Sequence, residues 1–319
     1  MENNRILGLH HVTALSSDAV KNVDFYAGIL GLRMVKKTVN FDAPDVYHLY
    51  YGDREGSPGT LMTFFPYTGM ARGRKGAGQL TVTSFSIPAG SLDYWIKRLD
   101  RFGIGYSGPR KRFENEEYIY LEDFDGLGIE LVTNDSDYRE GYIYGHIPRE
   151  HTIKGFYGIT LSESGPGRTG GFLSRLLDHK LIAEENGRSR FSPDGEVGGL
   201  ADVVPGASEP AGRQGSGTVH HVAFATAGDD TQLEIRDRLI SEGVHVTPVI
   251  DRQYFKSVYF REPGGVLFEV ATLPPGMAID EDPENLGSSL MLPPWHEKNR
   301  AEIESRLEPV ELDAGKFSD

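Results

Sequence analysis

The sequence predicts an α+β fold made of four copies of one βαβββ unit. The same order of elements recurs four times along the 319 residues: a strand, an amphipathic helix, and strands that end on a glycine-containing apolar run. The runs that flank the helices are short and rich in Val, Phe, Tyr and Thr, as is typical of strands. Two of these runs contain nearly the same letters, "LHHV" and "VHHV", although they lie far apart in the chain.

The first two units have the clearest patterns. Unit one runs from the strand "GLHHVTAL" through the helix "DAVKNVDFYAGIL" and the strand "YHLYYG" to "GTLMTFFP". Unit two runs from "LTVTSFSIP" through "SLDYWIKRLDRFG" and "EYIYLED" to "GLGIELVT". In the helix of unit one, Val23, Tyr26, Ala27 and Leu30 recur at the spacing of one helical face, which predicts an amphipathic helix packed on a sheet.

The last two units repeat the order with different residues. Unit three runs from "KGFYGITLS" through the helix "GGFLSRLLDHK" to "GGLADVVP". Unit four runs from "TVHHVAFAT" through "DTQLEIRDRLISEG" and "SVYFREP" to "GGVLFEVAT". We expect Gly31, Gly103 and Gly243 to end three of the helices, because glycine readily adopts the left-handed conformation found there.

Boundaries between the units are expected in stretches rich in Gly, Pro, Ser or charge, such as "YTGMARGRKGAG" and "GASEPAGRQGSG". A Pro-rich tail follows the last unit, and its final helix is expected in "EKNRAEIESRL". The predicted ranges are 1–67, 78–135, 152–206 and 217–273 for the units and 274–319 for the tail.

Composition limits the classes of partner. A net charge of −14 disfavours nucleic acids and anionic membranes, which bind clustered Lys and Arg. The absence of cysteine excludes disulfides, thiolate metal sites and cysteine nucleophiles. The first residues lack the apolar stretch of a signal peptide, and no apolar run is long enough to span a membrane, so we expect neither a signal peptide nor a membrane span. These observations favour a soluble, cytoplasmic protein with a small-molecule partner, and a homo-oligomer is compatible with them.

Equivalent positions in the four units hold different chemistry. The position of His11 in the first strand corresponds to Ser84, Tyr157 and His221 in the other units. In the last strand, the fourth residue after a glycine is Thr63, Glu130, Asp202 or Glu269. Only unit four combines a histidine with an acid, and only unit one offers another histidine.

This distribution predicts a metal site. Glu269 lies between apolar residues on a strand expected to be buried, where an unpaired carboxylate is strongly unfavourable. His11 and His221 are its natural neighbours, and two imidazoles with one carboxylate form the facial set that binds non-haem Fe(II) and leaves positions open. For Glu130 and Asp202 we expect exposed edge strands or salt bridges.

Strand alternation does not identify which histidine of each pair is the ligand. Successive residues of a strand point to opposite faces, so Leu9, His11 and Thr13 would share one face and His10 and Val12 the other. The remaining histidine could support the ligand from a bulged strand, or lie on the far side in the core.

The chain resembles the vicinal oxygen chelate superfamily, whose unit is βαβββ, and within it the hydroquinone-type ring-cleaving dioxygenases. The matching stretches cover the chain from end to end and include "LHHVT", "DFYAGILGLRMVKKTVNFD", "YHLYYGD", "PGTLMTFFP", "GTVHHVAF", "YFREPGGVLFEVAT" and "LGSSLMLPPW". The resemblance implies that the second histidine of each pair is the ligand, so that His11, His221 and Glu269 hold the metal.

The resemblance also implies supporting residues. His10 and His220 match positions beside the ligands. Arg252 and Tyr259 match positions that supply active-site groups. An arginine can stabilise a phenolate by a charge-assisted hydrogen bond, and a tyrosine can orient the substrate or donate a proton.

The expected activity follows from these positions. The resemblance implies Fe(II), with Mn(II) also suited to the ligand set, and an aromatic diol (a hydroquinone or a catechol) that is opened with O₂ to an acid. Units one and four would share the metal cup, and units two and three would form a metal-free partner. The alternatives are a glyoxalase-like isomerase or lyase, which usually needs another carboxylate where Thr63 stands, and a non-catalytic binding protein.

Overall fold

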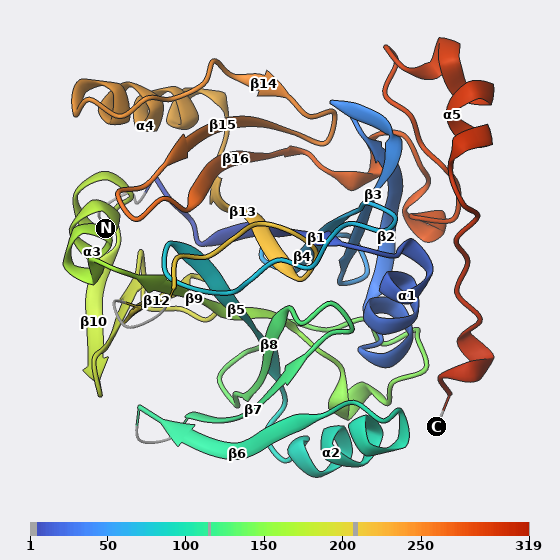
Figure 1. Ribbon diagram of the computed structural model, residues 1–319, viewed down its shortest axis with the longest axis horizontal. Coiled ribbons are helices and arrows are strands. Elements are labelled where there is room, and N and C mark those ends of the chain that lie inside the picture. Colours follow the sequence, from blue (N-terminus) through green and yellow to red (C-terminus); the bar gives the residue numbers. More distant parts are fainter. Residues whose placement is uncertain (1–4, 114–115, 207–209, 319) are drawn as a thin grey trace.

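Two eight-stranded sheets form the molecule, and each combines strands from distant parts of the chain (Figure 1). The computed structural model describes residues 5–113, 116–206 and 210–318. The first four residues of the range expected for unit one, residues 114–115 of the range expected for unit two, residues 207–209 of the linker before unit four, and the last residue of the tail lie outside the described residues. The strands are β1 Leu9–Ser16, β2 Arg33–Asn40, β3 Ala43–Gly52, β4 Leu61–Pro66, β5 Gln79–Ile87, β6 Tyr106–Arg112, β7 Glu116–Glu122, β8 Gly128–Thr133, β9 Gly155–Glu163, β10 Lys180–Glu185, β11 Arg188–Ser192, β12 Leu200–Pro205, β13 Thr218–Thr226, β14 Ile250–Asp251, β15 Phe255–Arg261 and β16 Leu267–Pro275.

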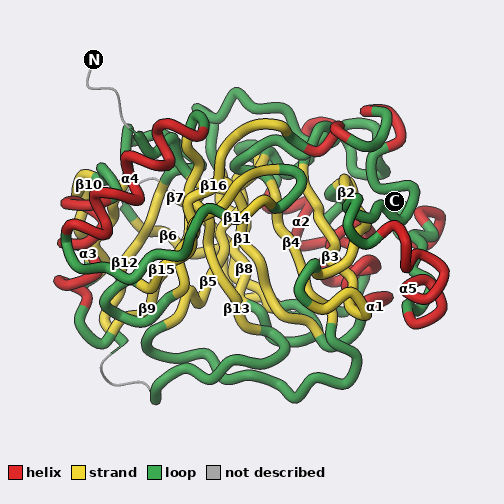
Figure 2. The backbone as a smooth tube through the Cα atoms, turned by 90° about the horizontal axis from the view of Figure 1, so that it is seen from above, coloured by secondary structure: helices red, strands yellow, loops and turns green. Residues whose placement is uncertain are grey.

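The helices lie outside the sheets, with α3 and α4 on one side and α1, α2 and α5 on the other (Figure 2). The α-helices are α1 Ala19–Val23, α2 Leu92–Arg101, α3 Pro166–Leu176, α4 Asp229–Ser241 and α5 Arg300–Arg306. A π-helix, η1 Asp24–Ile29, continues α1. The 3₁₀ turns are η2 Arg149–His151, η3 Met277–Ile279, η4 Pro283–Asn285, η5 Glu297–Asn299 and η6 Ala314–Lys316. No described helix is long and apolar enough to cross a membrane.

The strand order repeats a single pattern and confirms the expected α+β class. The first sheet has the order β14-β15-β16-β13-β1-β4-β3-β2, and the second has the order β10-β11-β12-β9-β5-β8-β7-β6. In the first sheet, β1 pairs with β13 in antiparallel fashion at the centre, and each also pairs with the last strand of its own repeat in parallel fashion. The first and fourth repeats of the chain therefore share one sheet.

Sequence patterns did not mark five strands. Four of them, β2, β6, β10 and β14, are each the second strand of a repeat and lie at a sheet edge, and the fifth, β11, lies beside β10. The run "YSGPRKR" of β6 and the run "KLIAEE" of β10 carry charged side chains that face solvent. Charged edge strands lack the apolar alternation that predicts a strand, and they prevent edge-to-edge association.

The expected helix ends agree with the structure in three cases and differ in one. Gly31, Gly103 and Gly243 all have positive φ angles, of 69°, 66° and 79°, just after their helices. The helix expected at 170–180 instead spans Pro166–Leu176, because a proline fits the first turn of a helix. Asp178, with a φ of 56°, takes the chain out of the helix early.

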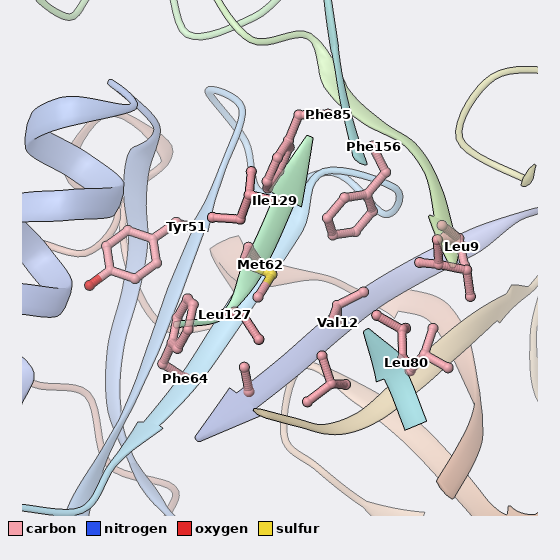
Figure 3. Close-up of a cluster of buried hydrophobic side chains, with 14 of the residues drawn as sticks. Leu9, Val12, Tyr51, Met62, Phe64, Leu80, Phe85, Leu127, Ile129 and Phe156 are labelled. Carbon is pink, nitrogen blue, oxygen red and sulfur yellow. The ribbon is translucent and has the colours of Figure 1, made fainter. Parts of the chain in front are cut away.

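A continuous apolar core lies between the two sheets (Figure 3). Val12 and Phe64 of the first sheet and Phe85 and Ile129 of the second are each 0% exposed. Alternate residues of these strands point away from this core, so each sheet has one face toward the core and one face away from it. The ligand-type histidines, His11 and His221, lie on the face of the first sheet that points away from the core.

The C-terminal tail packs beside β2 and β3 and is anchored by a buried charge (Figure 1). The side chain of Lys36 on β2 is fully buried, and its Nζ lies 2.6 Å from Asp280 and 2.5 Å from Glu281. Because a buried ammonium requires counter-charges, these two tail carboxylates are essential partners of the strand. The tail thereby fixes the outer strands of the first sheet.

Candidate metal centre

Two symmetric β-bulges bring all four paired histidines to the same region. The pairing of β1 with β13 skips His10 between Leu9 and His11, and it skips His220 between His221 and Val219. A bulged residue reverses the alternation of the strand, so Leu9 and Val12, three residues apart, both face the core. The expectation that Leu9 shares a face with His11 is therefore wrong, and the bulge is the reason.

Three ligand-type atoms converge at the centre of the first sheet. The Nε2 atoms of His11 and His221 lie 3.1 Å apart. Oε2 of Glu269 lies 3.3 Å from the first of these nitrogens and 3.0 Å from the second. Among the described residues, this is the only group of three or more His, Asp or Glu side chains close enough to hold a metal ion.

The surroundings of Glu269 fit a cation. The residue is 0% exposed, Ser257 donates a hydrogen bond to Oε1, and Oε2 has no hydrogen-bond partner among the described residues. Burial alone would raise the pKa of Glu269, but His11 and His221 outweigh it and hold the pKa well below its ordinary value. A charged, buried carboxylate oxygen that faces two imidazole nitrogens at 3.0 and 3.3 Å matches the donor set of a 2-His-1-carboxylate site.

The outer histidines fix the tautomers of the inner ones. Nδ1 of His10 lies 2.9 Å from Nδ1 of His11, and Nδ1 of His220 lies 2.8 Å from Nδ1 of His221. Burial, followed by the neighbouring histidine, lowers the pKa of His10 to about 3 and that of His220 to about 4, so both outer rings are neutral. For Nε2 of an inner histidine to act as a ligand, its Nδ1 must carry the proton and donate to the outer ring.

A cavity of about 410 Å³ opens onto the two inner histidines. Residues from both ends of the chain line it. Most are aromatic or polar: Asn40, Phe41, Asp42, His48, Tyr50, Phe65, Tyr67, His220, Thr247, Arg252, Phe255 and Tyr259, with Leu15, Ile250 and Leu267. Its volume is in the range of small-molecule sites.

Arg252 and Tyr259 form one unit on the cavity wall. Nε of Arg252 donates to the Tyr259 hydroxyl at 3.1 Å, and its guanidinium carbon lies 5.3 Å from the centre of that ring. Nη1 of Arg252 also lies 3.1 Å from Oδ2 of Asp42, on the hairpin opposite. Burial, followed by the charge of Glu269, raises the pKa of Tyr259 well above its ordinary value, so its hydroxyl stays neutral.

In the second sheet, arginines lie beside Glu130 and Asp202, the residues equivalent to Glu269. Arg112 binds Glu130 with contacts of 2.7 and 3.0 Å, and Arg190 binds Asp202 with contacts of 2.7 and 2.8 Å. Glu116 bridges the two arginines. The salt-bridge interpretation of the two acids is confirmed, but they are 4% and 3% exposed and do not lie on an exposed edge. Guanidinium groups supply the positive charge that these buried carboxylates require.

Sequence reasoning missed several residues around the site. His48 and Tyr50 line the cavity from β3, and Ser257 supports Glu269 from β15. The repeat could have identified Tyr50, because Tyr50 pairs with Thr63 in the same way that Tyr259 pairs with Glu269. Asp42 gave no signal, because it lies in a hairpin turn outside the repeated elements.

Comparison with known proteins agrees with this architecture. The family model "Glyoxalase/Bleomycin resistance protein/Dioxygenase superfamily" matches residues 8–131 and 163–270. MhqO of Bacillus subtilis (strain 168), a candidate ring-cleaving dioxygenase, is 42% identical over 97% of this chain and 98% of its own. The chlorohydroquinone/hydroquinone 1,2-dioxygenase of Sphingobium indicum is 35% identical over 94% of this chain and 95% of its own.

Solved structures show the same fold. The crystal structure of a candidate dioxygenase from Bacillus subtilis subsp. subtilis str. 168 has a TM-score of 0.92 and 41% identity, and the match covers 97% of this chain and 98% of that chain. Glyoxalase I from Zea mays has a TM-score of 0.60 at 14% identity, covers 83% of this chain and 92% of its own, and shows the fold alone. The chain belongs to the Glyoxalase/Bleomycin resistance protein/Dioxygenase superfamily.

Proposed function

We propose that the protein is an Fe(II)-dependent ring-cleaving dioxygenase that opens hydroquinones or catechols with O₂. One observation carries the proposal: the group of His11, His221 and Glu269 lies at a cavity of aromatic and polar side chains. Identity to the Sphingobium indicum chlorohydroquinone/hydroquinone dioxygenase along nearly the whole chain supports the same chemistry. Iron is preferred to Mn(II) on the family resemblance together with the ligand type, because both metals suit this ligand set.

The residues of the chain would divide the work. Bound Fe(II) would supply the redox chemistry with O₂, which amino-acid side chains lack. His10 and His220 would hold the inner histidines in the tautomer that presents Nε2. The Arg252–Tyr259 pair would place a cation and a neutral phenol against a substrate oxygen, which favours its ionised form.

Two alternative functions are less well supported. A glyoxalase-like isomerase or lyase usually needs a further carboxylate ligand, and the equivalent residue here is Thr63. The Thr63 hydroxyl is already engaged, 2.7 Å from Thr13 Oγ1 and 3.0 Å from His48 Nε2. A non-catalytic binding protein would not require the intact set of two histidines and one buried carboxylate that His11, His221 and Glu269 form.

Oxygen consumption separates these functions. Protein loaded with Fe(II) under anaerobic conditions is mixed with hydroquinone, catechol or substituted hydroquinones, and O₂ uptake and the ring-opened acid are measured. A dioxygenase takes up one O₂ for each ring opened. Glu269→Gln is the matched control, which should lose iron and activity together. Fully metallated protein that takes up no O₂ with any of these diols is not a dioxygenase of this type.

We also propose a division of the chain to accompany this function. Ranges 1–67 and 217–273 would build the metal site, and 78–135 and 152–206 the arginine-filled counterpart. The tail 274–319 would brace the first sheet. The shared first sheet and the burial of Lys36 against tail carboxylates support this division.

A further inference from the structure

Two polar residues on β3, which line the same cavity as Arg252, have no role in the function proposed above. His48 and Tyr50 lie two residues apart on β3, so their side chains share one face of the strand. Both line the cavity, although they are only 9% and 1% exposed. Polar groups this deeply buried are normally satisfied by hydrogen bonds, so their partners determine what remains for a ligand.

A chain of hydrogen bonds connects these residues to the centre of the sheet. The Tyr50 hydroxyl lies 2.9 Å from Nδ1 of His48, and Nε2 of His48 lies 3.0 Å from Thr63 Oγ1. Thr63 Oγ1 lies 2.7 Å from Thr13 Oγ1. Both ring nitrogens of His48 are therefore engaged, and the ring is held in one orientation.

This chain leaves Tyr50 with one unused hydrogen-bonding capacity. A neutral imidazole has one donor nitrogen and one acceptor nitrogen. If Nδ1 donates, the phenol proton is free; if Nδ1 accepts that proton, the phenol oxygen keeps its lone pairs. Burial raises the pKa of Tyr50 and lowers that of His48, so both residues remain neutral.

The internal repeat makes Tyr50 the counterpart of Tyr259. Tyr50 is the cross-strand partner of Thr63, as Tyr259 is of Glu269. The two tyrosines thus occupy equivalent positions on the two halves of the first sheet and line the same cavity. In one half the repeat supplies a metal-type ligand beside its tyrosine. In the other half it supplies Thr63, whose hydroxyl takes part in the orientation of His48.

We propose that Tyr50, positioned by His48, hydrogen-bonds the substrate oxygen that lies farthest from the Arg252–Tyr259 pair. This inference rests on the proposed function and deepens it, because it selects the substrate class. The two oxygens of a para-diol lie at opposite ends of the ring and can reach both walls of the cavity. The two oxygens of an ortho-diol share one edge of the ring. Tyr50 therefore favours hydroquinones over catechols.

Ligand binding without turnover tests this proposal. Dissociation constants of hydroquinone, phenol and catechol are measured anaerobically with Fe(II)-loaded protein. We expect Tyr50→Phe to weaken hydroquinone binding about tenfold, the value of one hydrogen bond, and to leave phenol and catechol within about twofold. In turnover, the same variant should raise KM for hydroquinone and change kcat little.

Matched variants separate recognition from general damage. Tyr51→Phe is the control, because Tyr51 is the adjacent buried tyrosine and its hydroxyl bonds Asn22 at 2.9 Å, away from the cavity. It should leave all three constants unchanged. His48→Leu should reduce the preference for hydroquinone over phenol, and His48→Gln should restore part of it, because its amide can still bond the Tyr50 hydroxyl.

The outcomes distinguish this inference from the proposed function. If Tyr50→Phe weakens phenol and hydroquinone equally, or neither, Tyr50 does not recognise the second oxygen, even if the enzyme consumes O₂. Wild-type protein that does not bind hydroquinone more tightly than phenol also overturns the inference. If the binding pattern is as expected but no O₂ is consumed, the recognition by Tyr50 stands and the dioxygenase proposal fails.

Discussion

Removal of His10 should weaken metal binding without removal of a ligand. The Nδ1 atoms of His10 and His11 lie 2.9 Å apart, and both rings are buried. In His10→Leu the Nδ1–H of His11 loses its acceptor and cannot reach water. An unsatisfied buried donor is unfavourable by about 1–3 kcal/mol, which corresponds to roughly a 5- to 150-fold loss of metal affinity. Residues that orient metal ligands typically have effects in this range.

Competition with a chelator measures this effect directly. Wild-type protein, His10→Leu and His10→Asn are titrated with Fe(II) under anaerobic conditions against a chelator of known affinity. Asn can present a carbonyl oxygen as the acceptor, so it should recover much of the affinity that Leu loses. Thermal unfolding of the metal-free proteins establishes that each variant is folded.

The repeat gives a second expectation for the same assay. His220 stands to His221 as His10 stands to His11, with a separation of 2.8 Å. His220→Leu should therefore cause a loss of similar size. If His10→Leu binds Fe(II) as tightly as the wild type, or if Asn is no better than Leu, the hydrogen bond between the rings does not orient the ligand.

Three further predictions concern other parts of the molecule. Burial, followed by the charge of Glu262, raises the pKa of Glu163 from 4.5 to about 8. The contribution of this group to the free energy of unfolding is therefore highest below pH 4.5 and falls by at most about 5 kcal/mol as the pH rises to about 8. Glu163→Gln should flatten this pH dependence in denaturant unfolding, and parallel curves for variant and wild type would refute the prediction. Arg190→Leu leaves the buried carboxylates of Glu116 and Asp202 with less positive charge beside them. It should lower the free energy of unfolding by about 3–5 kcal/mol without a change in iron content per folded molecule. A loss of iron at full stability would contradict this. Arg252→Lys should lower kcat/KM roughly 10- to 100-fold, whereas Asp42→Asn, at an exposed ion pair, should change it less than about threefold; equal effects would assign the role of Arg252 to the ion pair.

Much of the fold could be predicted because the repeats leave strong local signals. The buried first and last strands of each repeat have apolar runs, and Gly31, Gly103 and Gly243 lie where a left-handed residue ends a helix. The second strands could not be found this way, because β6 and β10 face solvent with charged side chains. Their place is set by pairing with the neighbouring strand, which is a tertiary interaction.

The candidate site was predictable to a similar degree. Equivalent positions indicated the two histidine pairs and Glu269, the family resemblance selected His11 and His221, and these three side chains lie together. The bulges at His10 and His220 could not be predicted, because strand alternation assumes an unbroken register. Arg112 and Arg190 were missed because Arg112 reaches Glu130 across the intervening strand β7 and Arg190 reaches Asp202 from the neighbouring strand, and single-strand patterns do not report such pairs.

Anomalous diffraction at the iron edge tests the central claim most directly, namely that the two ends of the chain share one metal. Crystals of protein loaded anaerobically with Fe(II) should show one strong peak, within bonding distance of Nε2 of His11, Nε2 of His221 and a carboxylate oxygen of Glu269. No peak is expected near Glu130 or Asp202, whose charges the arginines neutralise. A peak beside those acids, or none between His11 and His221 at full iron content, would contradict the account.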